Sequence, residues 1–438
     1  MRRMADTTFN RRKFVVGAAA VGLGAAGVVA TTGPPFGGGA RTISFWHLFS
    51  GGDGERMAQM LVAFDKASDI DVDPVTLQWG PPYYTKLQLA AVGGRPPDVA
   101  ISHATRLASL APAGLVQELT PDLLEPHGIT PDRFEPAVWK RGQFNGKQYA
   151  IPLDTHPFVL YYNTELAQKA DLLGDDKRLR PLQGEQEVLD AFAAMKEASG
   201  QWGVVTEIRG VSLWRLFLTL YGQQNGREMF SPSGTELTLD DAKGERALQF
   251  MQELGTGRKL MPTNLDYPAS IANFANGTTG TMLQGEWEVT TFQAAEMKFD
   301  MAPVPNILGD QKTQADSHAF VIPSNPGRSQ DRLDATLEFV SGMLDQSFTW
   351  AQGGHVPAWK PVLDSDRYRK LSPQSHYASA AENTIVDPAV WFSGSGSDLE
   401  NEAWGAFLGV VTGGASPKAG LAQFRAAMEQ FLEKPKPV

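Results

Sequence analysis

Strand and helix patterns alternate along the chain after residue 40. The apolar run 42–47 (TISFWH), the alternation over 75–79 and the short run 98–101 predict three strands. Between them, apolar residues recur every three or four positions, as on one face of a helix, at Met57, Met60, Leu61 and Phe64 and then at Tyr84, Leu87 and Ala91. Strands that alternate with helices indicate βαβ units. We therefore expect an α/β fold.

The segment 145–163 (NGKQYAIPLDTHPFVLYYN) predicts a crossing between two structural units. It opens on a hairpin-type turn, and a strand over 148–151 follows that Pro152 stops. A second strand is expected over 158–162. The residues between the two strands are polar: Asp154, Thr155 and His156. A crossing through a short polar break is typical of a hinge between two lobes.

The first 40 residues differ from the rest. Five basic residues and one acidic residue accompany an apolar run over 15–30, which is shorter than the roughly 20 residues that a membrane-spanning helix needs. This pattern predicts an export signal over 1–40, with a plausible cleavage site after Ala30. RRKFV at 11–15 resembles a twin-arginine signal. A Sec signal that contains two adjacent arginines is the alternative.

Charge and cysteine content narrow the partners and the compartment. Without 1–40 the chain has 34 basic and 48 acidic residues, a formal net charge of −14. A chain with this net negative charge repels nucleic acid and anionic lipid surfaces. The chain has no cysteine, which excludes disulfides, thiolate metal ligands and a lipoprotein anchor. We expect an extracytoplasmic location, either free in a periplasm-like space or tethered at the outer face of the membrane by an uncleaved leader.

Further motifs follow in a fixed order. They are GRPPDV at 94–99, YNTEL at 162–166, FANGTTGTM at 274–282, GEW at 285–287, PVP at 303–305, a strand-like run at 317–323 and GGHVP at 353–357. In this order, and together with 145–163, they resemble the extracellular solute-binding proteins of ABC importers, in the sugar-binding family 1 group. The resemblance covers nearly all of the chain after the leader.

The resemblance implies a two-lobed, periplasmic-binding-protein-like fold of type II. Each lobe would be a mixed sheet flanked by helices, with the ligand in the cleft between the lobes. The N-terminal lobe would take 41–153 plus 304–345, and the C-terminal lobe 154–303 plus 346–438. The implied function is capture of a sugar or oligosaccharide by lobe closure and its delivery to an ABC permease. The protein would be a monomer without catalytic activity, cofactor or metal.

Two other functions stay open. Phe45-Trp46-His47 also resembles binders of glycerophosphate-type ligands in the family, but only Arg106 and Arg209 are placed to meet a phosphate. A secreted glycoside hydrolase would need paired carboxylates, which meet only in space. The chain shows no zinc-protease, nucleophile-elbow, Walker or Rossmann motif, and its seven histidines show no metal-ligand spacing.

A saccharide site combines aromatic rings for C–H faces with polar groups for hydroxyls. Such residue types stand at expected strand ends and loops, where ligands of α/β folds bind. The candidates are Trp46, His47, Asp53, Tyr84, His103, Arg106, Asp154, Thr155, Trp214, Gln284, Gly285, Glu286, Trp287, His355 and Trp391. Several have a structural alternative: core packing for Trp46, Trp214 and Trp391, a helix N-cap for Asp53, and a surface ion pair for Arg106.

Overall fold

The computed structural model describes residues 41–225 and 228–436. The export signal predicted over 1–40 lies outside the described residues. Within them, every helix is too short or too polar to cross a membrane.

In the described part of the chain, a first mixed sheet has five strands in the order β2-β1-β3-β12-β6. Its strands are β1 (Thr42–His47), β2 (Asp71–Thr76), β3 (Val99–His103), β6 (Ala150–Pro152) and β12 (His318–Val321). β1 is parallel to β2 and β3, whereas β12 runs antiparallel to β3 and β6. The predicted first strand is confirmed. β2 ends at Thr76, so the expected alternation through Trp79 runs past the strand.

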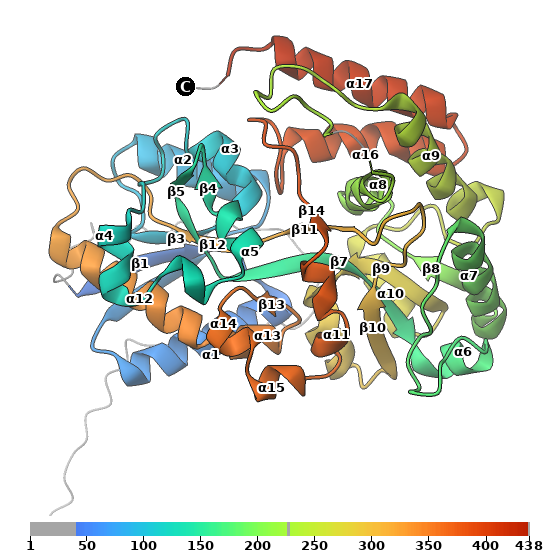
Figure 1. Cartoon of the computed structure of the whole chain (residues 1–438), viewed down its shortest axis with the longest axis horizontal. Helices are drawn as coiled ribbons and strands as arrows, with labels where there is room; N and C mark the ends of the chain where they lie inside the picture. The colour runs from blue at the N-terminus through green and yellow to red at the C-terminus, as the bar shows by residue number, and fades with distance from the viewer. Residues whose placement is uncertain (1–40, 226–227, 437–438) are drawn as a thin grey trace, which may run out of the picture. The chain divides into compact units, whose positions relative to one another are not determined.

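A second sheet of seven strands, counted over the same residues, centres on β7 (Asp154–Asn163). Its main path is β14-β11-β7-β9-β8, and β10 and β13 also pair with β7. The other strands are β8 (Trp202–Val205), β9 (Thr279–Gly285), β10 (Phe299–Pro303), β11 (Thr313–Asp316), β13 (Val356–Pro357) and β14 (Thr384–Ile385). In Figure 1, β7 is the long strand that runs from the middle of the molecule into this sheet. We call the part of the molecule built around the first sheet the first lobe, and the part built around the second sheet the second lobe.

Helices cover both sheets. Those around the first sheet are α1 (Gly51–Ala67), α2 (Pro81–Val92), α3 (Leu107–Leu110), α4 (Pro121–Leu124), α5 (Pro136–Arg141), α12 (Gln330–Asp345), α13 (Ser347–Ala351) and α14 (Lys360–Leu363). The short helix α15 (Asp366–Arg369) packs its buried Tyr368 against residues of the second sheet. Those of the second lobe are α6 (Thr164–Lys169), α7 (Glu185–Ser199), α8 (Ser212–Gly222), α9 (Asp241–Gln252), α10 (Tyr267–Ala275), α11 (Val289–Ala294), α16 (Asp398–Val411) and α17 (Pro417–Glu433). The face predicted for α1 is buried at Met57, Met60 and Phe64. Each lobe thus has its own apolar core.

The chain leaves the first sheet at Leu153, between β6 and β7. The turn predicted before it is confirmed: β4 (Gln143–Phe144) and β5 (Lys147–Gln148) form a hairpin. Its turn residues Asn145 and Gly146 have φ of 49° and 76°, and positive φ at both is what a type I′ turn requires.

The polar break expected at Asp154, Thr155 and His156 is wrong, because all three residues are the start of β7. Their backbones pair with β13 and β11. The side chains are buried and meet polar partners, so a polar segment can remain in a strand at little cost.

A second crossing lies at Ser317, between β11 in the second sheet and β12 in the first. Residues 304–316 therefore precede this crossing, although the sequence assigned them to the first lobe. Conversely, the sequence assigned residues 346–438 to the C-terminal lobe, but Trp350 and Trp359 belong to the apolar core of the first lobe. The exact division of the chain between the lobes stays a proposal, and we place the return crossing at Ser317.

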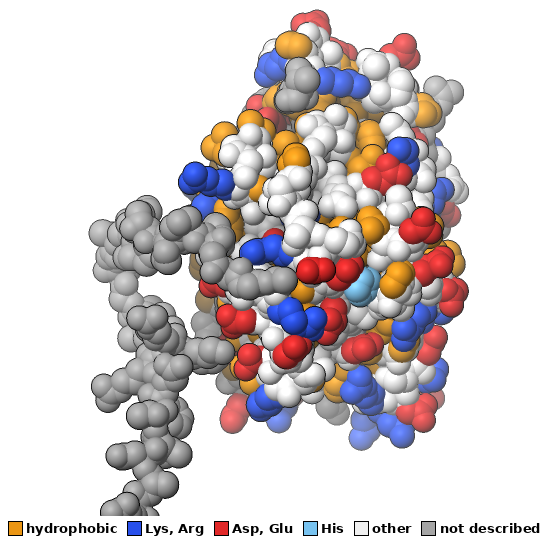
Figure 2. All heavy atoms as spheres, turned by 90° about the vertical axis from the view of Figure 1, so that its left-hand side faces the viewer, with side chains coloured by type: hydrophobic (Ala, Val, Ile, Leu, Met, Phe, Trp, Pro, Cys, Tyr) orange, Lys and Arg blue, Asp and Glu red, His pale blue; other side chains and the backbone are white. Residues whose placement is uncertain are grey.

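The exposed surface carries mixed charge. On the face shown in Figure 2, Lys and Arg side chains lie among Asp and Glu side chains. Arg41, which lies 2.6 Å from Asp69 and 3.1 Å from Glu338, illustrates such exposed pairing. Pairs of this kind typically contribute less than about 1 kcal/mol each, so the fold depends mainly on the apolar clusters formed by the described residues.

Candidate functional site

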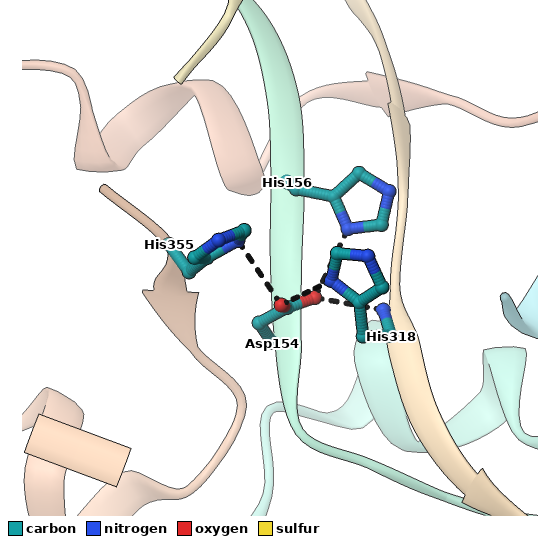
Figure 3. Close-up of side chains that lie close together, drawn as sticks. All are labelled: Asp154, His156, His318 and His355. Atoms are coloured by element: carbon teal, nitrogen blue, oxygen red, sulfur yellow. Dashed lines mark hydrogen bonds and ion pairs between the residues drawn. The ribbon is translucent and has the colours of Figure 1, made fainter. Parts of the chain in front are cut away.

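Asp154 is the centre of a buried polar cluster at the crossings. Trp350 Nε1 donates to its Oδ2 (2.7 Å), and the backbone N–H of His318 donates to its Oδ1 (2.8 Å). The Nδ1 atoms of His318 and His156 lie 2.7 and 3.1 Å from the two carboxylate oxygens. Figure 3 shows His156, His318 and His355 directed toward this carboxylate. Burial opposes ionisation, but the adjacent His318 and His156 hold the pKa of Asp154 well below its usual value.

His355 joins this cluster to α1 and to the end of β9. Its Nε2 lies 3.0 Å from Asp53 Oδ1, and its Nδ1 lies 3.2 Å from Asp154 Oδ2 and 3.0 Å from Glu286 Oε1. Its ring stacks on Trp350, with centroids 4.2 Å apart and planes at 10°. Despite burial, the surrounding carboxylates raise the pKa of His355 well above its usual value.

Glu286 and Asp53 occupy positions that the sequence only partly predicted. Glu286 is fully buried, which raises its pKa to about 7; its Oε1 lies 3.0 Å from His355 Nδ1, and its Oε2 has no hydrogen-bond partner. Ser50 stands at the N-cap of α1, and Asp53 lies in the first turn. The N-cap alternative for Asp53 is therefore wrong, and its carboxylate contacts His355 instead.

Tyr84, His103 and Arg106 contact one another beside the cluster. Tyr84 Oη lies 2.6 Å from His103 Nδ1, and the Arg106 guanidinium lies 4.4 Å from the centre of the Tyr84 ring. The His103 ring centre is 4.7 Å from that of His318. Burial lowers the pKa of His103 and raises that of Tyr84, so both are neutral at pH 7. Arg106, for which a surface ion pair was the alternative, packs its guanidinium over the Tyr84 ring instead.

Trp287 follows β9 in the short helix η5 (Glu286–Glu288). Its half-buried ring lies directly on Gly285, where an added Cβ would stand 1.9 Å from the indole. Close approach at Gly285 is therefore made by Trp287 rather than by a bound molecule. Trp287 Nε1 donates to Tyr267 Oη (2.6 Å), and the Arg215 guanidinium lies 4.9 Å from the centre of its ring. These contacts hold the half-buried Trp287 ring next to the cluster, with its centre 6.0 Å from that of His156.

Trp214 and Trp391 pack within the second lobe. The Trp214 ring contacts Phe217 and Phe424, and its Nε1 donates to Asp387 (2.8 Å). Trp391 contacts Phe392 and Phe431. Both match the core-packing alternative, and the structure brings neither into contact with the cluster around Asp154.

The remaining candidates have local partners. Trp46 edges a surface hollow of about 730 Å³ that Pro81, Thr85 and Lys86 also line. His47 is held between Thr76 and the backbone of Phe49, and burial lowers its pKa to about 4. The last two candidates, Gln284 and Thr155, also have polar partners inside the fold. Gln284 contacts Ser212, and Thr155 accepts a hydrogen bond from Arg141.

Sequence reasoning missed His318 and Trp350, and it named His156 only as part of a polar break. His318 and Trp350 lie 164 and 196 positions from Asp154, so no local spacing could link them. The fold nevertheless brings three histidines and Asp154 into one cluster. The expectation of no metal site, which depended on spacing, thereby loses its basis.

Residues 59–371 match the family model described as bacterial extracellular solute-binding protein. The chain belongs to this family. A maltotriose-binding protein of Pyrococcus abyssi is 22% identical over 278 residues, which are 63% of this chain and 56% of the relative. A maltooligosaccharide ABC transporter solute-binding lipoprotein of Streptococcus pneumoniae is 24% identical over 285 residues, 62% of each chain. This solute-binding protein thus spans 56% and 62% of the lengths of these two relatives.

Solved structures show the same fold. The GacH receptor of Streptomyces glaucescens superposes with a TM-score of 0.75 at 19% identity, over 90% of this chain and 99% of that one. The maltose/maltodextrin-binding domain MalE from Bdellovibrio bacteriovorus gives 0.72 at 19% identity, over 90% and 100% of the two chains. The expected two-lobed periplasmic-binding-protein fold is confirmed.

A second group of buried acids lies near the lobe contact. Thr105, just after β3, donates through its backbone N–H to Asp316 Oδ1 (3.3 Å), and Ser395 donates to Thr105 Oγ1 (3.3 Å). Burial raises the pKa of Asp316 to about 7 and that of Glu400 to about 8. The backbone N–H of Gly396 donates to Glu400 (2.7 Å).

We expect Glu400→Gln to reduce the loss of stability on raising the pH. In the unfolded chain a glutamate has a pKa of about 4.3, whereas in the folded protein the pKa of Glu400 is about 8. Between these two pH values the folded protein therefore binds more protons than the unfolded chain. The free energy of unfolding must then fall as pH rises through this window. Urea unfolding at pH 5 and pH 8 measures the fall. Glu402→Gln, on the exposed side of the same helix, is the control. A wild-type pH slope in Glu400→Gln would mean that Glu400 does not cause the fall.

Proposed function

We propose that this protein captures a sugar or oligosaccharide between its lobes and delivers it to an ABC permease. The observation that carries the proposal is the convergence of ring and polar groups from both sheets at the crossings. The first lobe supplies Tyr84, His103 and Arg106, and the second supplies Glu286 and Trp287. Such a set offers stacking faces and hydrogen-bonding groups together, as a saccharide requires.

Glu286 supports the proposal in particular. Its Oε1 has only the ion pair with His355, and its Oε2 has no hydrogen-bond partner; an unsatisfied buried polar group costs about 1–3 kcal/mol. Hydroxyl groups of a bound saccharide would donate to a carboxylate and offset that cost. The nearby Trp287 ring would stack on the sugar, as its half-buried position allows.

The contacts between the lobes support capture by closure. Thr105 of the first lobe meets Asp316 and Ser395 of the second. Arg141 at the end of α5 donates to Thr155 (3.1 Å) and to Thr384 (2.5 Å), both in strands of the second sheet. A ligand that touches both lobes would favour the arrangement with these contacts formed, because it binds that state more tightly.

The permease partner and the extracytoplasmic location belong to the same proposal. The support is family membership and the name of the pneumococcal relative, an ABC transporter solute-binding lipoprotein. Export by a twin-arginine signal, and the absence of a lipid anchor, remain predictions from the sequence.

Calorimetric titration with glucose, maltose, maltotriose and a glycerophosphodiester tests the proposal. We expect one-to-one binding of at least one saccharide, without release of reducing ends. Failure of every saccharide, or binding of the phosphodiester alone with steep salt dependence, would overturn it in favour of another solute. Turnover of a saccharide at substoichiometric protein would show an enzyme instead.

A further inference from the structure

Four buried side chains at the crossings have the composition and spacing of a metal site. Asp154, His156, His318 and His355 each offer one ligand atom, and these atoms all lie within 4.8 Å of one another. The residues come from β7, from β12 and from the turn before β13. Three imidazole nitrogens and one carboxylate oxygen are a donor set that zinc accepts in tetrahedral geometry.

The distances are close to those that a zinc ion would impose. Zinc–nitrogen and zinc–oxygen bonds of about 2.0–2.2 Å place neighbouring ligand atoms of a tetrahedron about 3.4 Å apart. The Nδ1 atoms of His318, His156 and His355 lie 2.7, 3.1 and 3.2 Å from the nearer oxygen of Asp154. Small outward movements of these side chains would admit the ion.

The surroundings of the four residues supply what zinc ligands usually have. His355 presents Nδ1 to the cluster while its Nε2 lies 3.0 Å from the Asp53 carboxylate. Such carboxylate–histidine pairs orient the histidines that bind zinc. Trp350 Nε1 likewise fixes the Asp154 carboxylate (2.7 Å).

The surroundings of His355 favour an added cation. Its buried Nδ1 lies between Asp154 Oδ2 (3.2 Å) and Glu286 Oε1 (3.0 Å) without a well-directed hydrogen bond to either, and Glu286 Oε2 has no hydrogen-bond partner. Asp53, Asp154 and Glu286 surround one histidine, so the site holds more carboxylates than the histidine alone can balance. A divalent cation would complete the coordination of His355 and offset this charge.

We propose that Asp154, His156, His318 and His355 bind one Zn²⁺ ion, with Asp53 as the residue that positions His355. The ion would join both lobe crossings to the turn before β13, and so would favour one arrangement of the lobes. The four ligands are all side chains of this chain, so metal binding can be measured without any solute.

Titration of the full chain with Zn²⁺ and with Co²⁺, after treatment with a chelator and without any saccharide, tests this proposal. We expect one-to-one binding, the visible absorption of four-coordinate Co²⁺, and a rise in Tm with Zn²⁺. His156→Ala and His318→Ala should each weaken Zn²⁺ binding by more than about 100-fold, and Asp53→Asn by about 10–100-fold. His127→Ala and His376→Ala, outside the cluster, should bind as the wild type does.

Unchanged Zn²⁺ affinity in the folded cluster variants, or equal loss in the His127 and His376 variants, would overturn the proposal. So would the absence of binding to the wild type. Should a histidine variant fail to fold by circular dichroism, Asp53→Asn at the edge of the cluster decides the matter. Saccharide titration in the presence of chelator is read separately, so failure of the metal site leaves the proposed function standing, and the converse also holds.

Discussion

Replacing Asp154 with alanine should lower the free energy of unfolding by about 3–5 kcal/mol. The variant leaves the indole N–H of Trp350 and the backbone N–H of His318 without their acceptor inside the fold. It also deprives three histidines of their common negative partner. Urea unfolding in the presence of chelator, followed by far-ultraviolet circular dichroism, measures the loss.

Two further variants make this test specific. Asp154→Asn keeps one carbonyl acceptor, so its loss should be smaller. Asp65→Ala changes an exposed aspartate of α1 and should stay within about 0.5 kcal/mol of the wild type. If Asp154→Ala matched Asp65→Ala, the buried cluster would not contribute to stability. Loss of stability with unchanged saccharide binding would assign Asp154 to structure alone.

Trp287→Ala should weaken saccharide binding by about 2 kcal/mol or more, close to 30-fold, because a stacked indole is typically a dominant contact. The fold should persist, since the ring is only half-buried and lies on Gly285 at the end of β9. Titration calorimetry with the best saccharide of the panel measures the change.

Trp202→Ala is the matched control for Trp287→Ala. Trp202 is also half-buried, but it pairs with Thr279 at the opposite end of β9. Its removal should leave the dissociation constant unchanged. Equal affinities of the Trp287 variant and the wild type would remove Trp287 from the binding site.

The sequence predicted the fold well where periodicity and turn chemistry act locally. The strand β1, the apolar face of α1 and the Asn145-Gly146 turn follow from short-range preferences. The start of β7 did not, because polar residues there suggested a break. Side chains alternate along a strand, so Asp154 and His156, which stand two positions apart, share one face. The strand geometry explains their contact. It was not predicted, because the polar residues of the segment were interpreted as a break between strands.

The candidate site could be predicted only in part. His103 was predicted because it follows an expected strand end, where ligands of α/β folds gather, and Glu286 because it stands between Gly285 and Trp287. His318 and Trp350 reach Asp154 through the return crossing and the packing of α13, and these contacts depend on the whole chain. Trp214 is a candidate that the structure places elsewhere. It stands at a predicted helix start but packs in the apolar core, and its sequence neighbours do not reveal this packing.

The distance between the lobes, measured by pulsed electron resonance, tests the central claim most directly. The chain has no cysteine, so Asp65→Cys in α1 and Glu197→Cys in α7 provide the only two labelling sites, one on each lobe and both exposed. Addition of the best saccharide should narrow the distance distribution to that of the structure, in which the lobes touch. An identical distribution without and with saturating saccharide would contradict capture by closure.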